Sequence, residues 1–257
     1  MNKIYAPLTK QIHRFTEQIC TFISPPHCTC CHAPLHDHSE ILCETCITEF
    51  IVATQVPYCP TCGTNTGPYA LLDDHCHICY HKKPSIARIA RVSTYQGPIK
   101  TIIGQLKYNG QTRFDKYLGT QLASAIIGDT QFHDIDGIVP IPLHWRRHLY
   151  RTYNQSAIIA NVTSAELKKY GLQAPVKRDL IRKIKTPSQM KLSRKQRLEN
   201  LKMAFAIRKD APFADKHICL IDDVTTTGAT LHMAAQLLKK FGCRKVSAAV
   251  IAVTPSP

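Results

Sequence analysis

The 257-residue sequence contains no long apolar run, no recognisable secretory signal and few acidic residues. No segment approaches the ~18–20 apolar residues that a membrane-spanning helix needs, so we expect no transmembrane segment. The first residues lack the basic start, unbroken apolar stretch and small-residue cleavage site of a signal peptide. We therefore expect a cytoplasmic protein in a reducing compartment, either free in solution or peripheral at the inner face of the membrane.

The scarcity of acidic residues leaves a strong positive charge. Only 18 Asp and Glu stand against 33 Lys and Arg, which gives a formal net charge of +15. Such a surplus favours a polyanionic partner, although it can also serve solubility alone. The hydrophobic fraction of 44% with 20% charged residues is typical of a globular protein.

Cysteine is nearly absent from the C-terminal two thirds and concentrated before residue 80. Eight of the early cysteines form four Cys-x2-Cys pairs: Cys28 and Cys31, Cys43 and Cys46, Cys59 and Cys62, Cys76 and Cys79. In a reducing compartment this regular pattern indicates metal binding rather than disulfides. Two such pairs complete the four-thiolate tetrahedron that structural zinc prefers, so we expect two structural zinc ions in a double zinc ribbon.

The sequence leaves the pairing of these motifs open. Successive pairing joins the first pair with the second and the third with the fourth, whereas interleaved pairing joins the first with the third. Cys30 could also replace Cys31 as a ligand. The nearby histidines find no vacancy beside four thiolates, and Cys20, Cys219 and Cys243 are interpreted as core or neutral thiols.

Three regions follow from the residue patterns. Residues 1–26 carry apolar residues at helical spacing, which predicts an amphipathic helix ended by two prolines: Ile4, Leu8, Ile12, Phe15, Ile19 and Phe22. Residues 27–82 hold the cysteine pairs but few large aliphatic residues, so this module needs metal to fold. Residues 86–257 alternate short apolar strands with helical stretches, which predicts an α/β domain with a mostly parallel sheet flanked by helices.

One segment of the α/β region carries chemistry. The apolar strand Ile218 to Ile221 leads into Asp222 and Asp223 and then into a Thr/Gly-rich turn that opens a helix. In open α/β sheets, ligands lie beyond the carboxyl ends of the strands, where the two carboxylates can accept hydrogen bonds from sugar hydroxyls. Backbone N–H groups at a helix start bind phosphate, and Gly228 permits close approach. The expected ribose and 5′-phosphate contacts are Asp222, Asp223, Thr225, Thr226, Thr227, Gly228, Ala229 and Thr230.

Strand, Asp-Asp, Thr-Thr-Gly-x-Thr and helix in unbroken order resemble the signature of type I phosphoribosyltransferases, which bind phosphoribosyl pyrophosphate. Together with the cysteine pairs, further segments make almost the whole chain similar to the ComF/GntX family of late competence proteins. These segments are Tyr95 to Ile99, Leu106 to Tyr108, Val139 to His144 with Arg147, Arg151 and Tyr153 to Gln155, and downstream Arg182, Gln189, Leu192, Arg197, Asn200 and Phe205.

The resemblance implies a type I phosphoribosyltransferase fold with a small N-terminal zinc-ribbon module. It also implies action in DNA uptake during natural transformation, with a helicase and other competence proteins as partners, and the positive charge agrees with binding of single-stranded DNA. By position, Arg147 and Arg151 are the candidates for the pyrophosphate, which would carry Mg²⁺.

Two other functions stay open at the sequence level. The chain could be a phosphoribosyltransferase of nucleotide salvage, or an adaptor that senses phosphoribosyl pyrophosphate without turnover. The sequence identifies no catalytic residue and no acceptor substrate.

Overall fold

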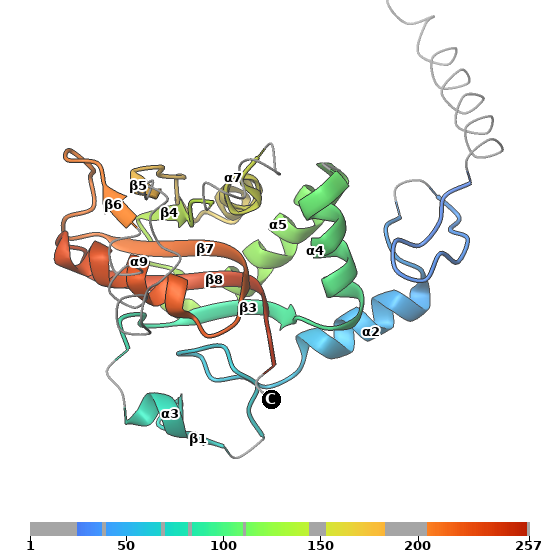
Figure 1. Cartoon of the computed structure of the whole chain (residues 1–257), viewed down its shortest axis with the longest axis horizontal. Coiled ribbons are helices and arrows are strands. Elements are labelled where there is room, and N and C mark those ends of the chain that lie inside the picture. Colours follow the sequence, from blue (N-terminus) through green and yellow to red (C-terminus); the bar gives the residue numbers. More distant parts are fainter. Residues whose placement is uncertain are drawn as a thin grey trace, which may run out of the picture.

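A parallel sheet forms the centre of the computed structural model, which describes residues 25–37, 40–67, 70–81, 84–109, 112–143, 153–182 and 205–255 (Figure 1). The sheet has four strands in the order β3-β8-β7-β4, and every pairing is parallel. Its strands are β3 (Ile89–Thr94), β4 (Gly137–Pro140), β7 (His217–Thr225) and β8 (Lys245–Val253). The predicted α/β class is confirmed.

Helices cover both faces of this sheet. One apolar cluster joins the sheet to α4 (Gly97–Asn109), α5 (Thr112–Ile127) and α7 (Gln155–Lys169), and a second joins it to α9 (Ala229–Lys240). Within β7, Cys219 and Ile221 belong to the first cluster, whereas Ile218 and Leu220 belong to the second. This alternation is the period of two that buries both faces of a strand.

The helices expected from apolar spacing are present. In α4 the side chains of Ile99, Ile102, Ile103 and Leu106 are all buried, and α9 ends shortly before Gly242, which has a positive φ of 95°. The sequence did not reveal α7, nor the antiparallel pair β5 (Leu180–Arg182) and β6 (Phe205–Ile207). A short 3-10 turn, η1 (Thr130–Phe132), precedes β4.

The cysteine-rich module contains more helix than its sequence indicates. Its elements are α2 (Glu44–Thr54), β1 (Leu71–Leu72), β2 (His75–Cys76) and α3 (His77–Tyr80). Helix α2 has no single apolar face that a sequence pattern would reveal: Ile51 and Val52 are exposed while Cys46 and Phe50 are buried. Phe50 packs on Tyr117 of α5 with 5.7 Å between ring centroids, so α2 is stabilised by the larger domain.

Of the amphipathic helix predicted for residues 1–26, residues 1–24 lie outside the described residues. Among the helices of the described ranges, none is long and apolar enough to cross a membrane.

Candidate functional site

Strand β7 is longer than predicted and carries the two aspartates within it. The sequence suggested that the strand ends at Ile221, but pairing with β8 continues through Asp222, Val224 and Thr225. On its other side, β7 pairs with β4 only as far as Ile221. The aspartates therefore lie on β7 just beyond the point where its pairing with β4 ends, so one edge of β7 is unpaired there. Pairing with β8 still fixes their backbone.

Side chains from two helices hold the aspartates. Ser156, near the start of α7, donates its hydroxyl to Asp222 Oδ1 at 3.0 Å. Lys107, in the last turn of α4, lies 3.0 Å from Asp223 Oδ2, and both side chains are only about 15% exposed (15% and 14%). These contacts fix the carboxylates before any ligand arrives, which is the arrangement that a specific hydroxyl-binding site needs.

The electrostatics of the two aspartates differ. Burial, and next the negative charge of Asp223, raise the pKa of Asp222 to about 7, although Ser156 and the backbone N–H of Asp223 donate to it and partly oppose the shift. Asp223 instead faces the Lys107 ammonium. Near neutral pH the pair thus holds less negative charge than two free carboxylates would, which eases the approach of an anionic ligand.

The turn after β7 has the geometry of an anion site. Gly228 is the N-cap of α9 with a φ of 70°, in the left-handed region, and it supplies no side-chain cap. Thr226 and Thr227 are exposed, whereas Thr225 is buried and its carbonyl accepts from Thr254 N–H at 2.9 Å. The N–H of Ala229, the first residue of α9, donates to Thr227 Oγ1 at 3.4 Å, so the start of α9 faces this turn.

A loop after β4 borders the same site. Asn154 caps α7 by accepting from Ser156 N–H, and its Nδ2 donates to the carbonyl of Ile141 at 3.0 Å. Tyr153 Oη donates to the carbonyl of Leu106 at 2.5 Å. This loop therefore ties α4 and β4 to the helix that carries Ser156. Arg147 and Arg151 lie outside the described residues, so their pyrophosphate contacts stay predictions.

The sequence reasoning missed Lys107 and Ser156. Lys107 lies in the segment Leu106 to Tyr108, which carries the family resemblance, and Ser156 directly follows Gln155, the end of another such segment. The sequence assigned neither residue a role. Their distances along the chain from the aspartates hide the contacts, because only the packing of α4 and α7 on the sheet brings them together.

Two four-cysteine groups form in the N-terminal module. Cys28, Cys31, Cys43 and Cys46 gather their sulfurs within 4.8 Å of one another, and so do Cys59, Cys62, Cys76 and Cys79. Successive motifs are therefore the ones brought together, rather than interleaved ones.

The geometry of both groups fits zinc. Zn–S bonds of about 2.3 Å in a tetrahedron place sulfurs about 3.8 Å apart. Cys31 and Cys43 sulfurs are 3.5 Å apart, and those of Cys62 and Cys76 are 3.8 Å apart. The backbone N–H of Cys76 donates to Cys59 Sγ at 3.3 Å, a contact that stabilises a thiolate.

The remaining described thiols take no part in these groups. Cys30 points its sulfur toward the carbonyl of Pro98 at 3.6 Å, so it does not replace Cys31. Cys219 and Cys243 are buried in the core of the α/β domain. Cys20 lies outside the described residues. His75 Nδ1 contacts Thr61 Oγ1 at 2.7 Å instead of a metal group.

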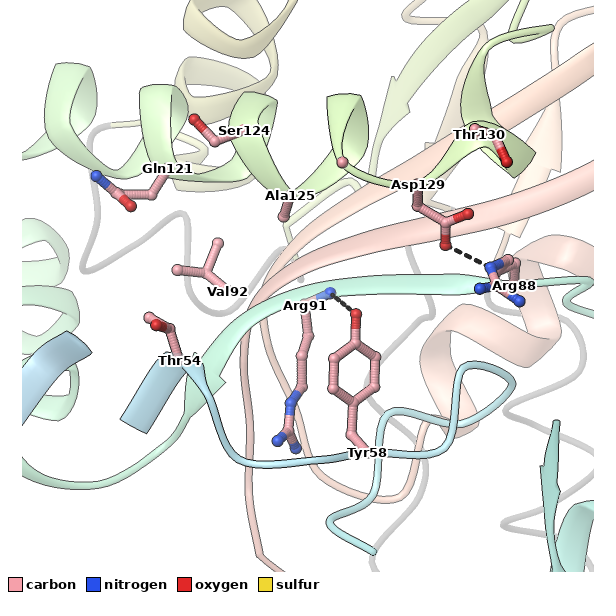
Figure 2. A pocket seen from close by; sticks show the side chains of 11 residues that line it. Thr54, Tyr58, Arg88, Arg91, Val92, Gln121, Ser124, Ala125, Asp129 and Thr130 are labelled. Atoms are coloured by element: carbon pink, nitrogen blue, oxygen red, sulfur yellow. Dashed lines mark hydrogen bonds and ion pairs between the residues drawn. The ribbon is translucent and has the colours of Figure 1, made fainter. Parts of the chain in front are cut away.

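A cavity of about 600 Å³ lies between β3, the end of α2 and the C-terminal half of α5 (Figure 2). Two arginines line it, but both are engaged by the protein. Arg88 pairs with Asp129 across its rim. Arg91 points from β3 toward the loop that carries Tyr58 and donates to backbone carbonyls there. This cavity is therefore a weaker anion site than the turn after β7.

Comparison with known proteins finds a matching domain model and relatives that cover most of the chain. A phosphoribosyl transferase domain model matches residues 154–257, which span α7 to β8 and include the turn. Competence protein F of Haemophilus influenzae is 30% identical over 226 residues, which cover 85% of this chain and 93% of that protein. DNA utilization protein YhgH of Escherichia coli is 31% identical over 229 residues, covering 86% and 94%.

The chain also matches solved structures at low similarity. A purine phosphoribosyltransferase from Pyrococcus horikoshii is 18% identical with a TM-score of 0.34, over 53% of this chain and 73% of that one.

Proposed function

This chain belongs to the family of competence protein F and DNA utilization protein YhgH, and from that premise we propose that it binds phosphoribosyl pyrophosphate and acts in DNA uptake. The domain match and the competence relatives support this role. The observation that supports this ligand most directly is the order of features at the end of β7. Two fixed carboxylates are followed by a helix start whose N-cap residue, Gly228, is left-handed and has no capping side chain.

Each part of the ligand has a proposed partner. Asp222 and Asp223 accept hydrogen bonds from the vicinal ribose hydroxyls. The 5′-phosphate lies in the turn from Thr225 to Thr230, where it meets main-chain N–H groups and threonine hydroxyls. Arg147 and Arg151 contact the pyrophosphate through guanidinium forks.

Mg²⁺ is proposed to arrive with the phosphates. Apart from the two cysteine groups, the described residues hold no cluster of three metal-ligating side chains. Asp222 and Asp223 offer the hard oxygens that Mg²⁺ prefers, but Lys107 already faces one of them. When bound, Mg²⁺ would offset the charge of the pyrophosphate.

The DNA-handling role rests on charge and family. The surplus of 15 positive charges suits the backbone of a single strand. Among the described basic residues, Arg178, Lys239 and Lys240 are exposed, and Lys239 and Lys240 end α9. The runs from Arg146 to Arg147 and from Lys183 to Arg197 lie outside the described residues. A helicase partner is proposed from the family resemblance.

Calorimetry with phosphoribosyl pyrophosphate and Mg²⁺ tests the ligand. The wild type should bind, and Asp223→Asn should weaken binding by roughly 1.5–3 kcal/mol, the range for a lost charged hydrogen bond. Asp210→Asn is a matched control, because Asp210 is exposed in the turn after β6. Equal affinity of all three proteins would remove the assignment of the aspartates.

A further inference from the structure

A cavity of about 610 Å³ connects the second cysteine group with the turn after β7. Cys62, Cys76 and Cys79 line one side of it. Thr226, Thr227 and Gly228, the centre of the proposed phosphate turn, line the other. The first cysteine group takes no part in this wall.

The loop of the second group is fastened to the sheet by polar contacts. The carbonyl of Pro60 accepts from Ile89 N–H at 2.6 Å, at the start of β3. Arg91, only 4% exposed, donates to the carbonyls of Gly63 at 2.7 Å and Val56 at 2.9 Å. Its guanidinium also lies 4.5 Å from the centre of the Tyr58 ring. Figure 2 shows the Arg91 and Tyr58 side chains beside each other. Because these carbonyls are met by a buried cation, the loop has little freedom to shift.

Gly63 links this loop to the end of β8. Gly63 follows the ligand Cys62 and has a φ of 77°, in the left-handed region. A Cβ built on it would come within 2.9 Å of Val253 Cγ2, so the loop backbone packs directly on that side chain. Val253 pairs with Thr225, the last residue before the phosphate turn, and Thr254 N–H donates to the carbonyl of Thr225. An unbroken series of contacts thus runs from the cysteine ligands to the turn.

We propose that the second cysteine group is a positioning element for the phosphate turn, so that metal binding there and phosphate binding at the turn reinforce each other. The proposal rests on the phosphate site proposed above. A metal held by Cys59, Cys62, Cys76 and Cys79 would fix the shape of the Gly63 loop, and that loop supports Val253 and hence Thr225. Coupling between two binding sites is reciprocal, so a phosphate ligand must in turn raise the affinity of this group for its metal.

The zinc affinity of the full-length chain tests the coupling. Ribose 5-phosphate is the probe, because it lacks the chelating pyrophosphate. Cys31→Ser/Cys43→Ser leaves only the second group, and Cys62→Ser/Cys76→Ser leaves only the first. In equilibrium competition with a chromogenic chelator, saturating ribose 5-phosphate should raise the zinc affinity of the second group about five-fold or more, the lower end of typical couplings. The zinc affinity of the first group should not change.

A pair of glycine variants tests the same path with all cysteines intact. Gly63→Ala places a methyl group against Val253 and strains a positive φ, whereas Gly67→Ala in the same module meets only Ala70 Cβ at 4.0 Å. Gly63→Ala should lower the affinity for ribose 5-phosphate several-fold while both zinc ions stay bound by native mass spectrometry. Gly67→Ala should match the wild type.

The outcomes separate the two proposals. A wild type that does not bind ribose 5-phosphate contradicts the phosphate site itself. Binding of ribose 5-phosphate with no change in the zinc affinity of the second group, or equal affinity of the two glycine variants for ribose 5-phosphate, overturns the coupling and leaves the phosphate site standing.

Discussion

The two cysteine groups share one ligand pattern but sit in different surroundings. In the first group, Cys28 and Cys46 are buried in the apolar cluster that includes α4 and α5, together with Leu42 and Phe50. The loop of the second group is held by Arg91 and main-chain hydrogen bonds, and it borders the phosphate turn. The same tetrahedral chemistry can therefore serve core stability in one place and positioning of a site in the other.

Metal removal should have the largest effect and tests both groups at once. Native mass spectrometry should find two zinc ions in the freshly reduced chain. Chelation should unfold the module, because zinc binding contributes about 10–16 kcal/mol to folding in zinc-finger peptides. Circular dichroism during chelation measures the loss. One ion or none per chain would contradict the pair of metal sites.

The next largest effect should come from the arginine that fastens the second group. Arg91→Met leaves the carbonyls of Gly63 and Val56 without their donor, at roughly 1–3 kcal/mol for each buried acceptor. Arg88→Met, at the residue just before β3, is the matched control. Its ion pair with Asp129 is partly exposed, and such pairs contribute about 0–1 kcal/mol. Urea unfolding of the two variants should therefore separate them, and equal losses would contradict the anchoring role of Arg91.

Much of this comparison could be predicted from the sequence. The ligand spacing indicated eight thiolates, and the run from Ile218 to Thr230 indicated strand, turn and helix. Both signals are local: a Cys-x2-Cys turn and a left-handed glycine at a helix start depend on neighbouring residues only.

The features that distinguish the two groups could not be predicted. Arg91 in a short apolar strand gives no sign that it will reach Gly63, and Lys107 gives none that it will reach Asp223. The extension of β7 through Thr225 was missed for a similar reason: Asp disfavours strands by propensity, and here pairing with β8 overrides that preference. Such contacts arise from tertiary packing, which no local pattern contains.

A smaller effect should appear in the pH dependence of the free energy of unfolding. The pKa of Asp222 is raised from 3.8 to about 7, so folding favours its protonated form. Its contribution to stability should fall as the pH rises from about 4 to about 7, and Asp222→Asn should remove that fall.

Binding of ribose hydroxyls should change in the opposite direction, because an ionised carboxylate is the stronger acceptor. Each pH unit below the pKa lowers the ionised fraction about ten-fold. The affinity ratio of wild type to Asp222→Asn should therefore rise between about pH 6 and pH 8, measured by calorimetry with ribose 5-phosphate. Titration of the ligand phosphate cancels in this ratio, and a flat ratio would exclude an ionised Asp222 from the contact.

The smallest change is expected in the affinity for single-stranded DNA when two surface charges are reversed. This measurement tests whether the α/β domain or the cysteine module binds the strand. Fluorescence anisotropy of a labelled oligonucleotide should show affinity that falls with salt, with a log–log slope of about −0.7 per phosphate contacted. Arg194→Glu/Lys195→Glu and Lys239→Glu/Lys240→Glu each reverse two charges in the α/β domain. A variant on the binding surface should make the slope less negative by about 1.4, the value for two lost phosphate contacts. Unchanged binding in both variants would assign the DNA-binding surface to the cysteine module. If the wild type does not bind DNA at low salt, the positive charge serves solubility only.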